Sequence, residues 1–83
     1  MLMYHAAYYP IEDGWFMARI LDFPGVISQG RNIEQARKMI KDALCLMAKH
    51  RLEHGSSLPR PNPRARDKKA VLIEAIRMKP SES

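Results

Sequence analysis

Six carboxylates are the candidates for metal-dependent hydrolysis of a phosphodiester. Such chemistry needs several carboxylates that converge on two ions about 3.5–4 Å apart. The six are Glu12, Asp13, Asp22, Glu34, Asp42 and Glu74. Glu12 and Asp13 precede a glycine and Asp22 precedes Phe-Pro-Gly, positions where short acidic side chains bond nearby backbone. We therefore expect turn-forming carboxylates, and no enzyme activity, catalytic residue, metal or other cofactor.

Two histidines and one cysteine are the remaining residues with metal-binding or nucleophilic chemistry. His50 and His54 are four residues apart, a spacing that can bind zinc from one face of a helix. No third ligand accompanies them, and histidines near a helix C-terminus also interact favourably with its dipole. Cys45 lies in an apolar stretch without a nearby general base, so we expect a small hydrophobic residue or an oligomer contact.

Trp15 and a run of bases are the candidates for binding a partner. Trp15 follows a turn, where it could anchor a partner, fold over a sheet or pack against a second copy of the chain. The bases are Arg60, Arg64, Arg66, Lys68 and Lys69. Such segments bind phosphate backbones without sequence specificity, contact an acidic protein surface, or serve only as a solvated linker.

Length and composition predict one small domain. The chain has 83 residues, of which 46% are apolar and 28% charged. Residues 1–30 contain one base and three acids, whereas residues 31–83 contain 13 bases and six acids. One cysteine allows no internal disulfide, which fits a reducing compartment. With no transmembrane span or signal peptide in the pattern, we expect a cytoplasmic protein and no membrane partner.

The first thirty residues predict three strands. In residues 2–9, Tyr4, Ala6 and Tyr8 share one face and the residues between them share the other, which is the two-residue period of a strand. A turn with Gly14 available for positive φ leads into residues 15–21, where Phe16, Ala18 and Ile20 form the expected core face. Residues 26–29 are a third, short strand that ends at Gly30.

A long amphipathic helix follows. Asn32 is the expected N-cap, with Gln35 in the reciprocal position of a capping box. The apolar stripe of this helix consists of Ile33, Ala36, Ile40, Ala43, Leu44 and Met47. Met39 and Leu46 lie off the stripe and indicate a lesser apolar face, and Gly55 is the expected stop.

The last third of the chain contains a basic, proline-rich connector over residues 55–69 and an apolar segment over residues 70–78. The apolar segment has the alternation of a strand, although a helix also accommodates it, and its β-branched content favours the strand. We expect residues 80–83 to be frayed. The whole is an α+β domain over residues 1–79 with the order β-β-β-α-β, a small antiparallel-type sheet and one long helix.

Residues 13–36 carry a combined motif. It runs Asp13-Gly14-Trp15-Phe16, then Asp22-Phe23-Pro24-Gly25, then Ser28-Gln29-Gly30, then Glu34-Gln35-Ala36. In this order and spacing, the motif resembles the HicB-like antitoxin family of the HicA–HicB toxin–antitoxin system, over about residues 3–60. The resemblance implies a partial ribonuclease-H-like fold without ribonuclease activity, with Gly14, Pro24, Gly25, Gln29, Gly30 and Asn32 as motif residues.

The same resemblance implies that the chain binds a HicA-like toxin, a small mRNA-cleaving protein, and forms a homodimer or higher homo-oligomer. Many relatives carry a C-terminal DNA-binding module, but residues 70–83 are too few for one. The leading hypothesis is therefore an antitoxin-like module that covers the active site of such a toxin, through Trp15 and the connector. The alternative is a stand-alone homo-oligomer of this fold whose ligand is unknown, with a weak, non-specific nucleic-acid contact through the connector.

Overall fold

The computed structural model describes residues 2–78 and has the predicted order of elements. Its elements are β1 (Leu2–Pro10), η1 (Glu12–Gly14), β2 (Phe16–Ile20), β3 (Ile27–Gly30), α1 (Ile33–Glu53) and β4 (Leu72–Met78). The α+β class and the single long helix are therefore confirmed. The alternative helical interpretation of the last segment is wrong, because this segment pairs with β1 as a strand.

The four strands form one antiparallel sheet in the order β3-β2-β1-β4. β1 and β2 are joined by a tight hairpin in which Asp13 and Gly14 both have positive φ, at 60° and 77°. The register places Tyr8 opposite Ala18 and Ala6 opposite Ile20. Since these four residues are buried, the core face predicted from alternation is confirmed.

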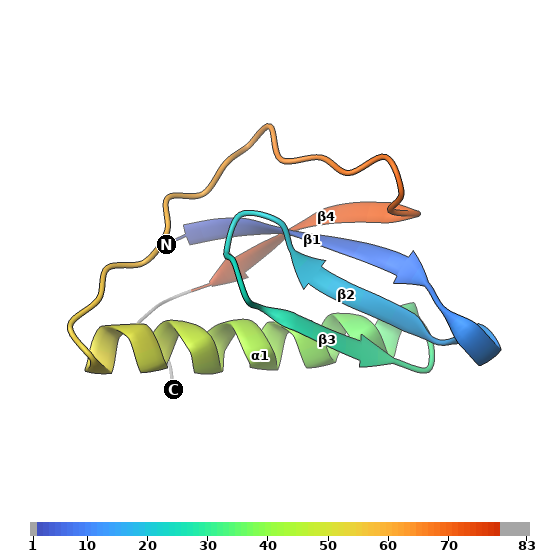
Figure 1. Ribbon diagram of the computed structural model, residues 1–83, viewed down its shortest axis with the longest axis horizontal. Helices are drawn as coiled ribbons and strands as arrows, with labels where there is room; N and C mark the ends of the chain where they lie inside the picture. The colour runs from blue at the N-terminus through green and yellow to red at the C-terminus, as the bar shows by residue number, and fades with distance from the viewer. Residues whose placement is uncertain (1, 79–83) are drawn as a thin grey trace.

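The sheet lies between α1 on one face and the connector on the other (Figure 1). On the α1 side, Tyr4, Ile20 and Phe23 pack with Ile40 and Leu44 of the helix in a single apolar core. On the other side, Ala7 of β1 and Ala65 of the connector are both buried. The second face of the sheet is thus partly covered by the chain itself, which the sequence pattern did not indicate.

Both ends of α1 are closed by hydrogen bonds that the sequence predicts. The Asn32 Oδ1 accepts from the Gln35 backbone N–H at 2.8 Å, while the Gln35 Oε1 accepts from the Arg31 N–H, one residue before the expected position. At the C-terminus, Gly55 has a φ of 75° and its N–H donates to the Leu52 carbonyl. A second bond, from the Ser56 N–H to the Arg51 carbonyl, completes a Schellman motif.

The final strand β4 begins at Leu72 and forms one edge of the sheet, and β3 forms the other. Ile76 and Met78 are buried on the side that faces α1. The tail of residues 80–83, expected to be frayed, lies outside the described residues. Within residues 2–78, no helix is both long enough and apolar enough to cross a membrane.

Candidate functional site

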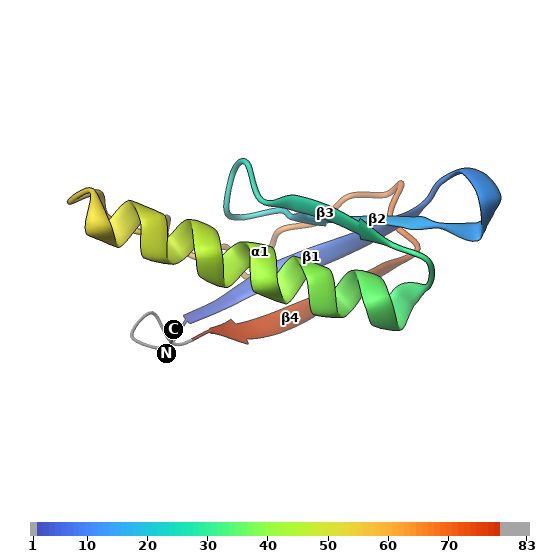
Figure 2. The same cartoon turned by 90° about the horizontal axis from the view of Figure 1, so that it is seen from below.

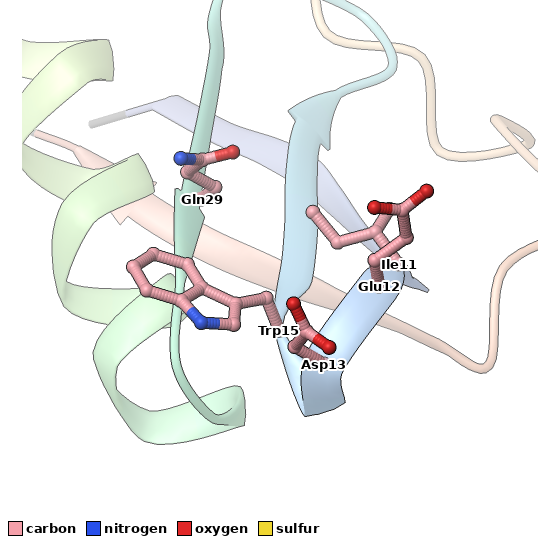
Figure 3. Close-up of a pocket in the computed structure, with 5 residues that line it drawn as sticks. All are labelled: Ile11, Glu12, Asp13, Trp15 and Gln29. Carbon is pink, nitrogen blue, oxygen red and sulfur yellow. The ribbon is translucent and has the colours of Figure 1, made fainter.

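The end of the β1–β2 hairpin contains an open hollow of about 540 Å³ around Trp15. It is lined by Ile11, Glu12, Asp13, Trp15 and Gln29. Figure 3 shows the indole ring of Trp15 reaching across to the strand that carries Gln29, with the Asp13 carboxylate near the base of its side chain. The hairpin therefore presents an aromatic ring with the Asp13 carboxylate beside it and the Glu12 carboxylate on the other side of the turn. We call this surface the hairpin hollow.

The local chain geometry makes the hairpin hollow accessible. Glu12 and Asp13 lie in η1, a turn that exposes both side chains, and Trp15 is half-buried. The Arg31 guanidinium carbon lies 5.8 Å from the centroid of the Trp15 ring, so a cation–π contact holds one side of the indole. A partner can reach the remaining surface of the ring, which is the kind of residue that anchors protein interfaces.

Asp22 fastens the connector to the sheet. Its carboxylate accepts bonds from the His5 N–H at 2.8 Å and from the Asn62 N–H at 2.9 Å, and it pairs with the His5 ring at 2.8 Å. The Asp22 side chain is only 3% exposed. The expectation that Asp22 bonds nearby backbone is therefore wrong, because its partners are 17 and 40 residues away in the chain.

Two tyrosines of β1 hold the connector at further points. The Tyr4 hydroxyl donates to the Pro59 carbonyl at 2.6 Å, and the Tyr9 hydroxyl donates to Asp67 at 2.6 Å. Arg19 also donates to Asp67, at 3.1 Å. The hydrogen bond from Tyr9, followed by one from the Lys69 backbone, lowers the pKa of Asp67. Asp67 therefore stays ionised within a fixed cluster.

The five connector bases are all exposed, and they are presented by backbone that these bonds hold in place. None of the five lines the hairpin hollow. Figure 1 shows the connector on the far face of the sheet from α1, whereas the hairpin projects beyond the sheet's end. Trp15 and the bases therefore lie on separate surfaces of the structure. The leading hypothesis expects both to contact the same toxin.

Glu74 forms a second ionic cluster, between β4 and α1. Arg37 donates to Glu74 from Nε at 2.5 Å and from Nη2 at 3.1 Å, and the Tyr8 hydroxyl donates to the same carboxylate at 2.7 Å. The Arg37 bonds are the main reason that the pKa of Glu74 is lowered. Burial, followed by the bond to Glu74, raises the pKa of Tyr8 well above its usual range. Sequence periodicity contains no signal for this pairing of residues 37 positions apart.

The residues considered for metal binding or nucleophilic chemistry do not assemble. Among residues 2–78, no group of three or more His, Cys, Asp or Glu side chains is placed to hold a metal ion. His50 and His54 stack at 4.2 Å between ring centroids, and the His54 ring bonds the His50 carbonyl at the helix C-terminus. Cys45 is exposed on α1, so it is not part of the core, and its alternative role as an oligomer contact stays a prediction.

A comparison with models of protein families shows to which family the chain belongs. The UPF0150-like model matches residues 2–59, from β1 to the start of the connector. The chain belongs to the UPF0150-like family. The N-terminal domain of the Burkholderia pseudomallei antitoxin HicB has the same fold, with a TM-score of 0.79 at 16% identity over 94% of this chain and 99% of that one. The predicted HicB-like resemblance is thus confirmed. No curated protein matches the chain.

The extent of the family match separates the two candidate surfaces. The hairpin hollow lies within residues 2–59 of this UPF0150-like chain, and so do the Pro24-Gly25 turn and Gly30. All five connector bases follow residue 59 and lie outside the matched segment. The hollow therefore lies within the segment that matches the family model, and the five bases lie outside that segment.

Proposed function

We propose that this UPF0150-like chain is an antitoxin-like binding module, not an enzyme, and that it neutralises a small mRNA-cleaving toxin by covering the toxin's active site. The observation that carries the proposal is the fold shared with the N-terminal domain of the antitoxin HicB over nearly the whole chain. The described residues contain no group of side chains placed for metal-ion catalysis, so inhibition by steric cover fits them better than chemistry does.

The hairpin hollow is the surface that we assign to the toxin. A ribonuclease that binds RNA carries basic side chains around its active site, because the phosphate backbone demands them. Glu12 and Asp13 are exposed beside Trp15, so they supply the opposite charge next to an aromatic anchor. The connector, with its five bases, would repel the same partner. The structure therefore favours Trp15 over the connector as the toxin contact.

The first test is co-expression with a small basic protein encoded beside this chain. We expect the two to co-purify, and we expect cleavage of mRNA by the neighbour to stop when both are present. Failure to co-purify would overturn the proposal. Because Trp15 is the only tryptophan in the chain, its fluorescence reports directly on the hollow, and we expect a blue shift on complex formation with a partner that contains no tryptophan.

Substitutions then locate the contact. Trp15→Ala should weaken the complex by roughly 30-fold or more, as the loss of a central aromatic anchor does. Leu72→Ala is the matched control, because Leu72 is also a large apolar residue that solvent reaches, but it lies in β4. Equal effects of the two substitutions would exclude the hairpin hollow as the docking site while leaving the antitoxin role open.

A second candidate function, a non-specific nucleic-acid contact, is supported by the fixed connector. Five exposed bases on anchored backbone form an array of positive charge, and the neighbouring Asp67 is already engaged by Tyr9 and Arg19. If three bases contact phosphates, the slope of log K against log salt for duplex DNA is about −3. Replacing Arg64, Arg66 and Lys68 with glutamine should abolish this slope, and absence of binding at low salt would refute the contact.

A further inference from the structure

Half of the sheet face that points away from α1 is left uncovered by the connector. The β2–β3 register pairs Met17 with Gln29 and Arg19 with Ile27, and these pairs alternate with the residues of β2 that pack in the core under α1. Over β1 the same face is covered, and Ala7 is fully buried there, whereas Ile27 on β3 is 56% exposed. We call the uncovered part, made of Met17, Ile27 and Gln29, the open face.

The open face is continuous with the hairpin hollow. Gln29 belongs to both surfaces, because it lines the hollow with Trp15 and shares its sheet face with Ile27 (Figure 3 shows Gln29 and Trp15). Ile27 comes two residues before Gln29, so it lies about 7 Å further along β3 on the same face. The two surfaces therefore form one strip that begins at Trp15 and ends at Ile27.

The hollow by itself is too small to hold a protein partner tightly. A stable interface buries about 800 Å² on each side and involves roughly 20–30 residues of each partner. The hollow is lined by five residues. A partner that binds firmly at Trp15 must therefore also contact the surface next to the hollow.

Charge limits the direction in which this contact can extend. Between β3 and α1, the Arg31 guanidinium lies against the Trp15 ring. Over β1, the connector presents its five bases. A partner with basic side chains, which the proposed function requires, meets like charge in both of these directions. The three residues of the open face carry no charge, so the contact extends most favourably along β2 and β3.

The one base beside the open face is neutralised by the connector. Arg19 is the only lysine or arginine in residues 1–30. It donates to the Asp67 carboxylate at 3.1 Å and to the Tyr9 hydroxyl at 3.2 Å, and its guanidinium carbon lies 5.7 Å from the centroid of the Tyr9 ring. These partners lie on the β1 side of Arg19, whereas Ile27 lies on its β3 side. The open face therefore has a neutral border where it meets the connector.

We propose that a basic protein partner docks along the strip from Trp15 to Ile27, and that Asp67 favours this docking by neutralising Arg19. The inference rests on the proposed function, and it adds the extent of the contact and a role for the connector. Asp67 lies outside residues 2–59, the segment that matches the family model. The connector then supplies one carboxylate to the border of the docking surface, while its bases confine the partner to β2 and β3.

The first experiment measures affinity for the small basic protein encoded beside this chain by titration calorimetry. Ile27→Lys should weaken the complex roughly tenfold or more, because it brings a like charge into the contact. Val71→Lys is the matched control, since Val71 is also β-branched and is 60% exposed, but it precedes β4 at the opposite edge of the sheet. It adds the same charge to the chain and should change the affinity less than about twofold.

The second experiment tests the charge of Arg19. Asp67→Asn should weaken the complex roughly threefold at low salt, which is the effect in water of one more unit charge about 6 Å from a charge of the partner. At about 1 M salt the difference should disappear, because the screening length falls to about 3 Å. Arg19→Gln combined with Asp67→Asn should restore the affinity. If Asp67 served only to hold the connector, this double variant would stay as weak as Asp67→Asn.

The results separate this inference from the proposed function. Equal effects of Ile27→Lys and Val71→Lys would overturn the open face as a docking surface, and the proposed function would stand if Trp15→Ala still weakened the complex. A double variant without restored affinity would overturn the role of Asp67. Absence of any complex with the unmodified chain would overturn the proposed function, and the docking strip with it.

Discussion

Replacing Gly30 with alanine should destabilise the protein, although Gly→Ala in ordered backbone often has the opposite effect. Gly30 is not a positive-φ glycine. A Cβ at this position would overlap the Ala36 nitrogen and would lie 2.8 Å from the Ala36 Cα, and both are backbone atoms of the first turns of α1. Backbone cannot rotate away as a side chain can, so α1 must move off β3.

The magnitude follows from two opposing contributions. Overpacking against a rigid neighbour costs about 1–3 kcal/mol, and a collision with backbone belongs at the upper end. The lower chain entropy of unfolded alanine returns about 0.4–1 kcal/mol. The free energy of unfolding should therefore fall by about 2 kcal/mol, and the melting temperature by roughly 8–16 °C for a domain of this size.

Urea unfolding followed by circular dichroism measures this change, with the m-value testing that the unfolded state is unchanged. Gly55→Ala is the matched control, since Gly55 follows the other end of α1, has a φ of 75° and leaves open space within 4 Å of where a Cβ would lie. It should lose about 1 kcal/mol from backbone strain alone. If Gly30→Ala were as stable as the unmodified protein, the close approach of α1 to β3 would be refuted.

Two further predictions concern the ionic clusters. Asp22→Asn should lower the free energy of unfolding by about 2 kcal/mol, because a buried carboxylate loses charge-assisted bonds. Protease cleavage near Asn62 should also become faster, because Asp22 no longer holds the connector as tightly. Asp42→Asn, at an exposed position, is the control and should change neither quantity. The pKa of Glu74 is lowered by Arg37, so its contribution is complete above pH 4.5 and is lost as the pH falls through the lowered value. Glu74→Gln should therefore be less stable at neutral pH, and its deficit should shrink on acidification; a deficit independent of pH would contradict this.

Local patterns predicted the elements because each element depends on residues close together in the chain. The alternation around Tyr4 and Tyr8 and the Asn32 cap of α1 are of this kind, and both are confirmed. The path of the connector is different. It depends on bonds such as those from Tyr4 to Pro59 and from Asn62 to Asp22, which join residues 55 and 40 positions apart. Such pairs have no periodicity, so the sequence alone left open whether the connector is a solvated linker or a surface for a partner.

The candidate site was predictable to the same limited degree. Trp15 is recognisable as an aromatic residue beside a turn, but the partner that completes its hollow, Gln29, comes from β3 after a second reversal of the chain. The exposed charges of Glu12 and Asp13 indicate a partner contact only because the structure places them in the same hollow as the indole. Composition pointed towards the bases, whereas the structure shows that the segment shared with the family carries the hollow.

The register of β3 decides on which side of the sheet the hairpin hollow opens. Gln29, which lines the hollow, is paired with Met17 on the sheet face away from α1. A partner bound in the hollow would therefore approach from the side opposite to the one that Figure 2 shows, where α1 lies in front.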